Sequence, residues 1–133
     1  VALIRNHRPV VDDFVWELPA GTLDGEEAPE VCARRELIEE AGYEAGSIEP
    51  LSAFYSTPGV TDEVLHAFVA TDLRRVERSL EPDERIEVHL VEGSEAVAMA
   101  RDGRMKDSKS MLALLLARSR GLIDGGWAGN GKA

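Results

Sequence analysis

The pattern of apolar and polar side chains predicts five strands along this chain. The clearest case is residues 85–91, where Ile86, Val88 and Leu90 alternate with charged or polar neighbours, as in a strand with one buried face. Four further apolar stretches are bounded by residue types that favour turns. They are residues 1–6, 14–18, 52–56 and 64–70.

Helical patterns fall between and after these strands. A polar loop at residues 22–27 leads into a helix that ends at Gly42, a residue type common directly after a helix. A short helix is expected at residues 94–101, and Asp107 is placed to cap a last apolar helix. Residues 74–85 form a charged connection, long enough to indicate a functional role. This order of strands and helices predicts an α/β (α+β) fold.

The composition is that of one globular domain. The chain has 133 residues, of which 44% are apolar and 30% charged, and its net charge is −10. We expect a folded domain over residues 1–122 and a flexible Gly-rich tail at 123–133. The acidic balance argues against binding of a nucleic acid polymer, and the longest apolar run, residues 111–117, is too short to span a bilayer. A single cysteine, Cys32, excludes an internal disulfide, so the sequence favours a cytoplasmic protein.

The negative charge is concentrated in one part of the chain. Residues 17–49 contain ten carboxylates against only two arginines, which accounts for −8 of the net −10. On the predicted helix, Glu36, Glu39 and Glu40 share one face, and like charges at such spacings destabilise a helix by roughly 0.2–0.5 kcal/mol per pair. A bound divalent cation such as Mg²⁺ would relieve this repulsion, since hard cations prefer oxygen ligands. The alternative is an acidic face exposed to solvent.

The same helix contains a motif with fixed spacing. Gly21 is followed after five residues by Glu27, and after seven more by Arg-Glu-Leu-Ile-Glu-Glu-Ala-Gly-Tyr at residues 35–43. This matches in full the Nudix box, Gly-x5-Glu-x7-Arg-Glu-U-x-Glu-Glu-x-Gly-U, in which U is a bulky apolar or aromatic residue. The chain therefore resembles the Nudix hydrolases over residues 1–122. The resemblance implies a mixed β-sheet sandwiched between helices, a loop–helix–loop metal site, and hydrolysis of nucleoside diphosphate derivatives that depends on Mg²⁺, with Mn²⁺ as a substitute.

The resemblance also implies roles for individual residues. The metal ligands would be the carboxylates of Glu36, Glu40 and Glu39 and the main-chain carbonyl of Ala20. Metal ions at such a site neutralise phosphate oxygens and acidify a water molecule. Arg35 would act in catalysis by orienting the carboxylates through hydrogen bonds. Glu27 would be an anchor behind the ligands or, alternatively, a ligand itself.

A second resemblance concerns the substrate. Pro58 lies fifteen residues beyond Tyr43, within Ser-Thr-Pro-Gly-Val-Thr-Asp-Glu at residues 56–63, and this context resembles the ADP-ribose pyrophosphatase subfamily. The stretches at 5–8 and 16–21 are similar to the same subfamily. The substrate-binding residues so implied are Arg8, Glu17, Pro58, Gly59 and Glu63. Arg8 would contact a phosphate, and Glu63 would lie near the terminal ribose or the attacking water. Without the flanking match, Pro58 and Gly59 are equally consistent with a simple hairpin turn.

Two glutamates compete for the role of general base. The segment Glu-Pro-Asp-Glu-Arg-Ile-Glu-Val at residues 81–88 resembles the one from which this subfamily supplies its base, and Glu84 is the preferred candidate. Nudix enzymes differ in which glutamate accepts the proton, so Glu39 is the alternative. A third interpretation makes Glu84 an exposed loop charge.

Together these resemblances predict an Mg²⁺-dependent enzyme that splits ADP-ribose into AMP and ribose 5-phosphate and forms a homodimer. The alternatives are a Nudix pyrophosphatase for another nucleoside diphosphate sugar or for a nucleoside triphosphate, and a domain that binds ADP-ribose as a sensor without hydrolysing it. The chain opens inside an apolar run without an initial Met and has no signal-peptide pattern. We therefore expect the natural protein to continue at this end. The resemblance to the ADP-ribose pyrophosphatase subfamily implies that the missing part includes a segment that helps to hold adenine and pairs with the partner subunit.

Overall fold

Nine helices and strands make up residues 1–124, the part of the chain that this computed structural model describes. Their order is β1 (Ala2–Arg8), β2 (Asp13–Glu17), α1 (Pro29–Glu36), η1 (Leu37–Ala41), β3 (Tyr43–Tyr55), β4 (Val64–Arg75), β5 (Ile86–Leu90), α2 (Gly93–Asp102) and α3 (Ser108–Ser119). Residues 125–133 of the predicted tail lie outside the described residues.

β1 is the central strand of a three-stranded antiparallel sheet with the order β2–β1–β5. Successive side chains of a strand point to opposite faces of its sheet. Val88 of β5, which pairs with Ile4, packs against Leu37 of η1. Leu3, one position along β1, packs instead against Met99 of α2. The sheet is therefore covered by a helix on each face.

β3 and β4 form a two-stranded antiparallel hairpin whose strands are longer than the sequence predicted. Gly46 and Pro50 weaken the strand pattern in the first half of β3. The extended conformation is nevertheless selected because it buries Ala45 and Leu51 against the helices. The pairing register shifts between Pro50 and Ser52, where proline removes one donor from the ladder.

The helix that contains the box changes its winding part-way. α1 is a regular helix to Glu36, and η1 continues it as a π-helix, which the sequence did not predict. The N–H of Gly42 donates to the carbonyls of Ile38 and Leu37, and Gly42 adopts the left-handed conformation with φ 74°. The predicted end of the helix at Gly42 is thus confirmed. The predicted cap of α3 is confirmed as well, since the Asp107 side chain accepts from the N–H of Ser110.

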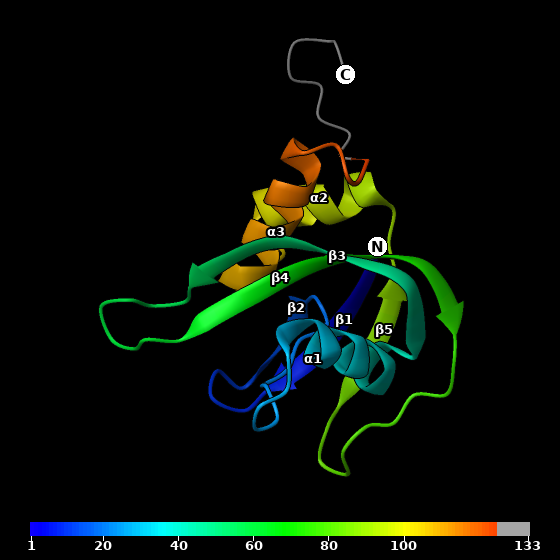
Figure 1. Cartoon of the computed structure of the whole chain (residues 1–133). Helices are drawn as coiled ribbons and strands as arrows, with labels where there is room; N and C mark the ends of the chain where they lie inside the picture. Colours follow the sequence, from blue (N-terminus) through cyan, green and yellow to red (C-terminus); the bar gives the residue numbers. More distant parts are fainter. Residues whose placement is uncertain (125–133) are drawn as a thin grey trace.

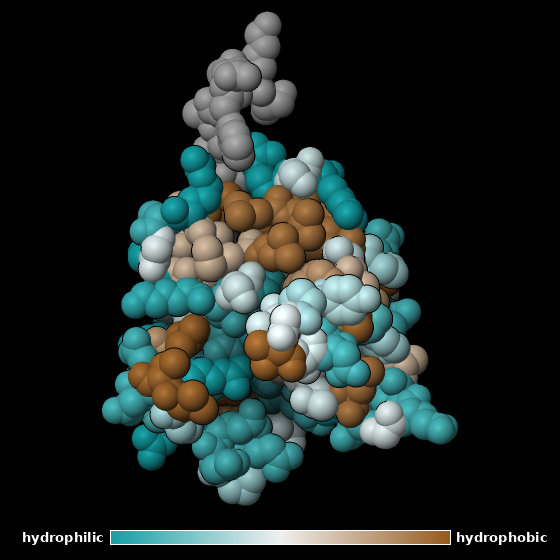
Figure 2. All heavy atoms as spheres, turned by 90° about the vertical axis from the view of Figure 1, so that its left-hand side faces the viewer, coloured by the Kyte–Doolittle hydropathy of each residue, from teal (hydrophilic) through white to brown (hydrophobic). Residues whose placement is uncertain are grey.

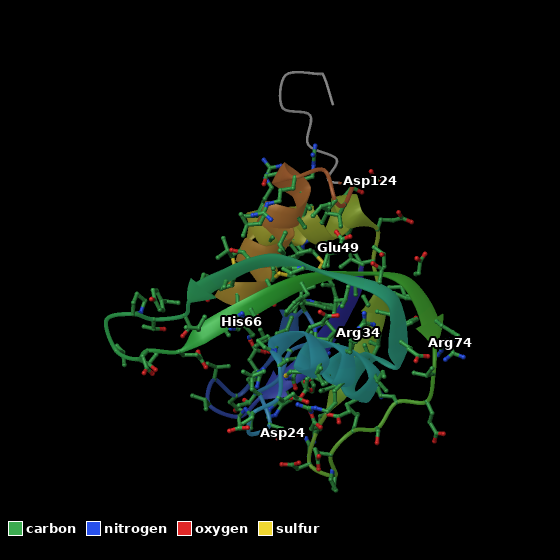
Figure 3. The ribbon with its side chains drawn as sticks, viewed as in Figure 1. Asp24, Arg34, Glu49, His66, Arg74 and Asp124 are labelled. Carbon is green, nitrogen blue, oxygen red and sulfur yellow. The ribbon has the colours of Figure 1, made fainter. Side chains whose placement is uncertain are left out.

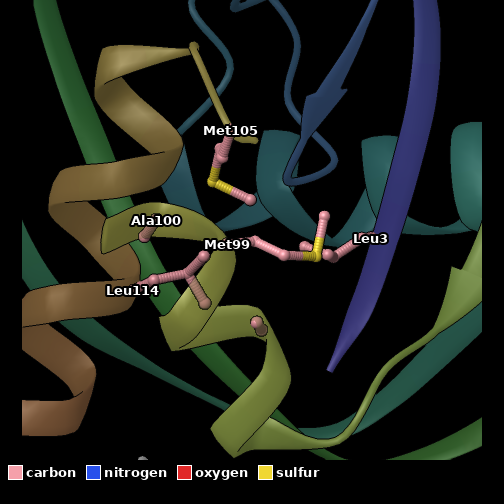
Figure 4. Close-up of a cluster of buried hydrophobic side chains, with 6 residues drawn as sticks. Leu3, Met99, Ala100, Met105 and Leu114 are labelled. Carbon is pink, nitrogen blue, oxygen red and sulfur yellow. The ribbon is translucent and has the colours of Figure 1, made fainter. Parts of the chain in front are cut away.

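The three-stranded sheet and the hairpin lie between two groups of helices, with α2 and α3 on one side and α1 on the other (Figure 1). Ala113 and Ala117 of α3 pack against Leu51 of β3, whereas Ala41 of η1 packs against Ala45. The cluster between β1 and the C-terminal helices is shown in Figure 4. It contains Leu3, Ala96, Met99, Ala100, Met105 and Leu114.

The expected α/β class and the arrangement of β-structure between helices are confirmed. The paired strands within residues 1–124 are all antiparallel and form two sheets, where the sequence led us to expect one mixed sheet. Within the same residues, no helix combines the length and the apolar character needed to cross a bilayer. Figure 2 shows one broad apolar area at the level of α2 and α3, and smaller apolar groups among hydrophilic side chains below it.

Candidate functional site

Arg35 is the centre of the hydrogen bonds among the box residues. Its Nε and Nη2 atoms donate to the two carboxylate oxygens of Glu27 at 3.0 and 2.9 Å. Its Nη1 atom donates to Glu36 Oε1 at 2.9 Å and to Glu39 Oε2 at 3.1 Å. One guanidinium thus joins a glutamate from the loop before α1, one from α1 and one from η1.

The contact between Arg35 and Glu27 is a bidentate ion pair. The hydrogen bonds from Arg35, followed by one from the backbone N–H of Asp24, lower the pKa of Glu27 to about 2. The Asp24 carboxylate lies 3.7 Å from Arg35 Nη2, and Figure 3 shows Asp24 in the loop below α1. Both oxygens of Glu27 are engaged by Arg35, which favours an anchor over a metal ligand between its two predicted roles.

Glu36 and Glu40 lie against the backbone of Ala20 and Gly21. The N–H of Ala20 donates to Glu40 Oε2 at 3.3 Å. A Cβ atom at Gly21 would lie 2.0 Å from Glu36 Oε1, so only glycine permits this approach. Glu40 is only 7% exposed, and this burial, with the neighbouring charge of Glu36, raises its pKa. Burial raises the pKa of Glu36 as well.

The oxygen atoms of Glu36, Glu40 and the Ala20 backbone fit a hard divalent cation as ligands. Ionising two partly buried carboxylates side by side costs free energy, and a cation between them would offset that cost. Carboxylate and backbone oxygens are also the ligands that Mg²⁺ prefers. Within residues 1–124, no three acidic, histidine or cysteine side chains converge as a ready metal site. Glu27, Glu36 and Glu39 all accept hydrogen bonds from Arg35. Glu36 and Glu40, whose pKa values burial raises, are the carboxylates that a cation beside the Ala20 backbone would stabilise most.

The charged connection after β4 is attached to the C-terminal end of η1. The N–H of Val76 donates to the carbonyl of Gly42 at 2.9 Å, and the N–H of Ser79 donates to that of Glu39 at 3.2 Å. Arg78 Nη1 donates to the carbonyl of Ile86 at 2.8 Å and to that of Glu40 at 3.5 Å. These bonds satisfy backbone carbonyls that the last turn of a helix leaves without partners.

Glu84, the preferred candidate for the base, lies in this same connection. Its carboxylate accepts from the N–H of Glu81 at 2.7 Å, and its own N–H donates to the Glu81 carbonyl at 3.0 Å. The negative charge of Glu84 is among the causes that raise the pKa of Glu40, after burial and the Glu36 charge. The structure therefore brings Glu84 into the electrostatic neighbourhood of the box carboxylates.

Arg8 and Glu17 form a second bidentate ion pair. Arg8 Nε and Nη2 donate to the two carboxylate oxygens of Glu17 at 2.8 and 2.7 Å. The Glu17 side chain is 2% exposed, whereas that of Arg8 is 47% exposed. The hydrogen bond to Glu17, then the charges of Glu17, Asp107 and Glu40, raise the pKa of Arg8, so its guanidinium lies within electrostatic range of Glu40. The carboxylate of Glu17, one of the predicted substrate-binding residues, is thus buried and accepts both hydrogen bonds from Arg8.

Pro58, Gly59 and Glu63 lie in the connection between β3 and β4. All three are exposed, and the carbonyl of Glu63 accepts from the N–H of Ser56 at 3.3 Å. Figure 1 shows this tip of the hairpin projecting beyond the rest of the chain, away from α1. Within one copy of the chain, the tip is therefore separate from the box carboxylates.

Sequence reasoning missed a group of residues in the first turn of α3. Lys109 Nζ lies 3.9 Å from Glu17 Oε1, and the hydroxyl of Ser110 accepts from the N–H of Leu18 at 2.9 Å. The sequence identified Asp107 as a cap, but nothing in the local pattern links this turn to β2. Arg78 was missed for the same reason, since its partners Glu40 and Ile86 belong to other elements.

Comparison with known proteins decides the family. The model of the NUDIX domain matches residues 1–115 of the chain. The chain belongs to the Nudix hydrolase family. The box residues Gly21, Glu27, Arg35, Glu36 and Glu40 of this Nudix domain are those that the structure brings together.

Two relatives illustrate the activities found among similar proteins. The chain is 35% identical over 116 residues to an ADP-ribose pyrophosphatase of Bacillus subtilis (strain 168). The aligned region covers 86% of this chain and 63% of the relative. The chain is also 39% identical over 115 residues to a GDP-mannose pyrophosphatase of Yersinia enterocolitica. That aligned region covers 84% of this chain and 60% of the relative. The Nudix domain thus spans less than two thirds of the length of these relatives.

A solved structure supports the fold. The crystal structure of an ADP compounds hydrolase superposes with a TM-score of 0.81 at 22% sequence identity, and the match covers 90% of this chain and 64% of that one. At this identity the likeness shows a shared fold.

The Nudix domain also has an apolar groove of about 410 Å³ outside the box. Its walls include Ala28 and Pro29 before and at the start of α1, and Leu51, Phe68 and His66 of the hairpin. Figure 3 shows His66 on β4. None of the box carboxylates lines this groove, so it is distinct from the candidate metal site.

Proposed function

We propose that this Nudix domain hydrolyses the pyrophosphate bond of a nucleoside diphosphate sugar and depends on Mg²⁺. The observation that carries the proposal is the pair of partly buried carboxylates, Glu36 and Glu40, placed against the backbone of Ala20 and Gly21. Two relatives that are at least 35% identical are pyrophosphatases of ADP-ribose and of GDP-mannose. All the box carboxylates are present, which favours hydrolysis over binding as a sensor.

Within this class we propose ADP-ribose as the substrate, with AMP and ribose 5-phosphate as products. The context of Pro58 supports this choice, as does the ADP-ribose pyrophosphatase among the relatives. The second candidate substrate is GDP-mannose, because relatives with this activity reach a similar identity.

The chain's own residues divide the chemistry between them. A divalent cation bound at Glu36, Glu40 and the Ala20 backbone would neutralise the pyrophosphate and acidify a water molecule. Arg8, half exposed and within electrostatic range of Glu40, would bind a phosphate oxygen while Glu17 holds its guanidinium in place. Glu84 would accept the proton of the attacking water. Glu39 is the alternative candidate for this base; it is engaged in an ion pair with Arg35, whereas the hydrogen bond that Glu84 accepts comes from a neutral backbone N–H.

We propose further that the active form is a homodimer. The predicted substrate residues Pro58 and Glu63 lie on a hairpin tip that projects away from the box of their own chain. The tip also exposes apolar side chains, with Val60 at 87% and Tyr55 at 64%. A second copy that covers this tip would bury these side chains and bring Pro58 and Glu63 to a box.

A substrate panel tests the proposed reaction. The purified protein is incubated with Mg²⁺ and ADP-ribose, GDP-mannose, another nucleotide sugar or a nucleoside triphosphate, and the products are identified by mass spectrometry. We expect AMP and ribose 5-phosphate from ADP-ribose, at the highest kcat/KM of the panel. Preference for another nucleotide sugar would contradict the choice of substrate, and no turnover of any compound would contradict the proposed activity.

The substitution Glu40→Gln tests the metal site. An amide cannot replace an anionic ligand, so turnover should be lost and Mn²⁺ affinity should fall by more than about 100-fold, beyond the usual effect of residues behind the ligands. Glu49→Gln, at an exposed position of β3, is the matched control. Circular dichroism should show an intact fold, because the amide removes a buried charge. Near-normal activity of Glu40→Gln at low Mg²⁺ would rule out the proposed site.

A further inference from the structure

The first turn of α3 contacts the end of β2, directly before the loop that contains Ala20. The N–H of Leu18 donates to Ser110 Oγ at 2.9 Å, although the two residues are 92 positions apart. Ser110 is 1% exposed, and its hydroxyl donates in turn to Asp107 Oδ2. The same oxygen of Asp107 accepts from the N–H of Ser110 at 3.3 Å. Asp107, the cap of α3, thus orients the Ser110 hydroxyl that accepts the hydrogen bond from the N–H of Leu18.

This contact restrains the backbone on one side of Pro19. Proline has no N–H, so the backbone donors of residues 18–20 are those of Leu18 and Ala20. The N–H of Leu18 bonds to Ser110 on α3, and that of Ala20 bonds to Glu40 on η1 at 3.3 Å. The loop is therefore held at two points by two different helices.

The same turn of α3 also contacts the residue before Leu18. Lys109 Nζ donates to the two carboxylate oxygens of Asp107 at 2.9 and 3.0 Å and lies 3.9 Å from Glu17 Oε1. Glu17 is the buried partner of Arg8. One helix turn is thus in contact with both Glu17 and Leu18, and it connects the C-terminal helix to the candidate site.

We propose that Ser110 is a positioning residue for the metal site, because its bond to Leu18 sets the place of the Ala20 backbone against Glu40. The inference rests on the proposed function, since it takes Glu36, Glu40 and the Ala20 backbone as the ligands of the cation. Ser110 itself acts only through Leu18 and Ala20. Residues that orient metal ligands from behind typically change metal affinity by about 10–100-fold when they are replaced.

The test uses two measurements that need no turnover: Mn²⁺ affinity by electron paramagnetic resonance, and exchange of the Leu18 amide by NMR. Ser110→Ala should weaken Mn²⁺ binding about 10–100-fold and speed the exchange of the Leu18 amide. Ser110→Thr keeps the hydroxyl and should bind Mn²⁺ much as the wild type does. Ser119→Ala is the matched control, because it removes an exposed hydroxyl that donates to a backbone carbonyl at the other end of α3. It should change neither measurement.

Unchanged Mn²⁺ affinity in folded Ser110→Ala overturns the inference. An equal loss in Ser110→Ala and Ser110→Thr overturns it too, because side-chain volume and not the hydroxyl would then matter. If Ser110→Ala does not fold, Ser110→Cys takes its place, since a thiol is a weak acceptor. A wild-type chain that binds no Mn²⁺ overturns the proposed metal site and the inference together. Wild-type binding with an unchanged Ser110→Ala overturns the inference alone.

Discussion

Hydrogen bonding to Arg35 and burial shift the pKa values of the box glutamates in opposite directions. Glu27 accepts two hydrogen bonds from the guanidinium, which lower its pKa to about 2. Glu40 is buried beside Glu36, and burial raises its pKa. Glu36 accepts a hydrogen bond from Arg35 Nη1 at 2.9 Å, yet burial raises its pKa as well. The raised pKa values of Glu36 and Glu40 support these two carboxylates as the proposed metal site.

The ion pair of Glu27 leads to a prediction for stability against pH. The pKa of Glu27 is lowered from 4.5 to about 2, so the pair stabilises the fold fully above about pH 4.5 and loses this effect as the pH falls through 2. Glu27→Gln should therefore lower Tm at pH 7, with a difference from the wild type that narrows below pH 4.5. Melting curves from pH 7 to pH 3 measure this, with the exposed Glu26→Gln as control. A constant difference over that range would contradict the prediction.

The position of Glu84 leads to a prediction for catalysis. If it accepts the proton of the attacking water, Glu84→Gln should lower kcat by roughly 10²–10⁴-fold and leave Mn²⁺ affinity nearly unchanged. Steady-state kinetics at saturating Mg²⁺ and a separate metal titration distinguish the two effects. Glu81→Gln, three positions earlier in the same connection, is the control. An unaltered kcat in Glu84→Gln would transfer the role to Glu39.

At the scale of elements, the main feature is the junction between η1 and the charged connection. A π-helical turn commonly occurs at a functional site. Here the carbonyl of Glu39 accepts from Ser79, that of Glu40 accepts from Arg78, and that of Gly42, directly after the turn, accepts from Val76. The element that contains Glu40 and the connection that contains Glu84 are consequently held together by backbone hydrogen bonds. We expect the distance between Glu40 and Glu84 to change when a substitution alters this junction.

Gly42 allows this junction to be tested. An L-residue in the left-handed conformation costs roughly 1–2 kcal/mol, and a Cβ atom at Gly42 would also lie 3.1 Å from the carbonyl oxygen of Val76. Gly42→Ala should lower the free energy of unfolding by more than this strain alone, and should reduce kcat. Gly103→Ala is the control, because Gly103 has φ 92° with no atom near its Cβ position. Equal losses in urea melts would show that the contact with Val76 is unimportant.

At the scale of the whole molecule, α1 lies on the side of the strands opposite α2 and α3, and the hairpin tip projects at the periphery (Figure 1). α3 packs on β3 through Ala113 and Ala117, and its first turn contacts the end of β2 through Ser110. The C-terminal helix therefore supports both the hairpin and the loop beside the box. In the proposed homodimer, the hairpin tip of one copy would lie at the box of the other.

The proposed homodimer predicts the effect of a charge on the hairpin tip. Val60 is 87% exposed, so Val60→Asp should leave the fold of the single chain unchanged. In a dimer that buries the tip, the same charge should dissociate the subunits and reduce turnover. Light scattering after size exclusion measures the mass, with the exposed Thr71→Asp, at the far end of β4, as control. A wild type that is monomeric and active would contradict the proposed dimer.

The sequence predicted the parts of the site that depend on neighbours along the chain. The box spacing placed Glu27, Arg35 and Glu36 on one loop and helix, and the residue types at Gly42 and Asp107 indicated a helix end and a cap. These features are local, because helix geometry and capping relate residues only a few positions apart. Regular spacing did not predict the π-helical turn of η1, and Gly46 and Pro50 concealed the full length of β3.

Local sequence thus determined the family, the α/β class and the carboxylates that would hold a cation. The tertiary structure decided which of these groups have partners. It buried Glu17 beneath Arg8, joined Leu18 to Ser110 across 92 positions, and brought Ser79 to the carbonyl of Glu39. Such contacts arise when apolar faces of separate elements pack together, and the polar groups buried with them must find partners wherever the packing places them. No pattern within a few residues encodes that outcome.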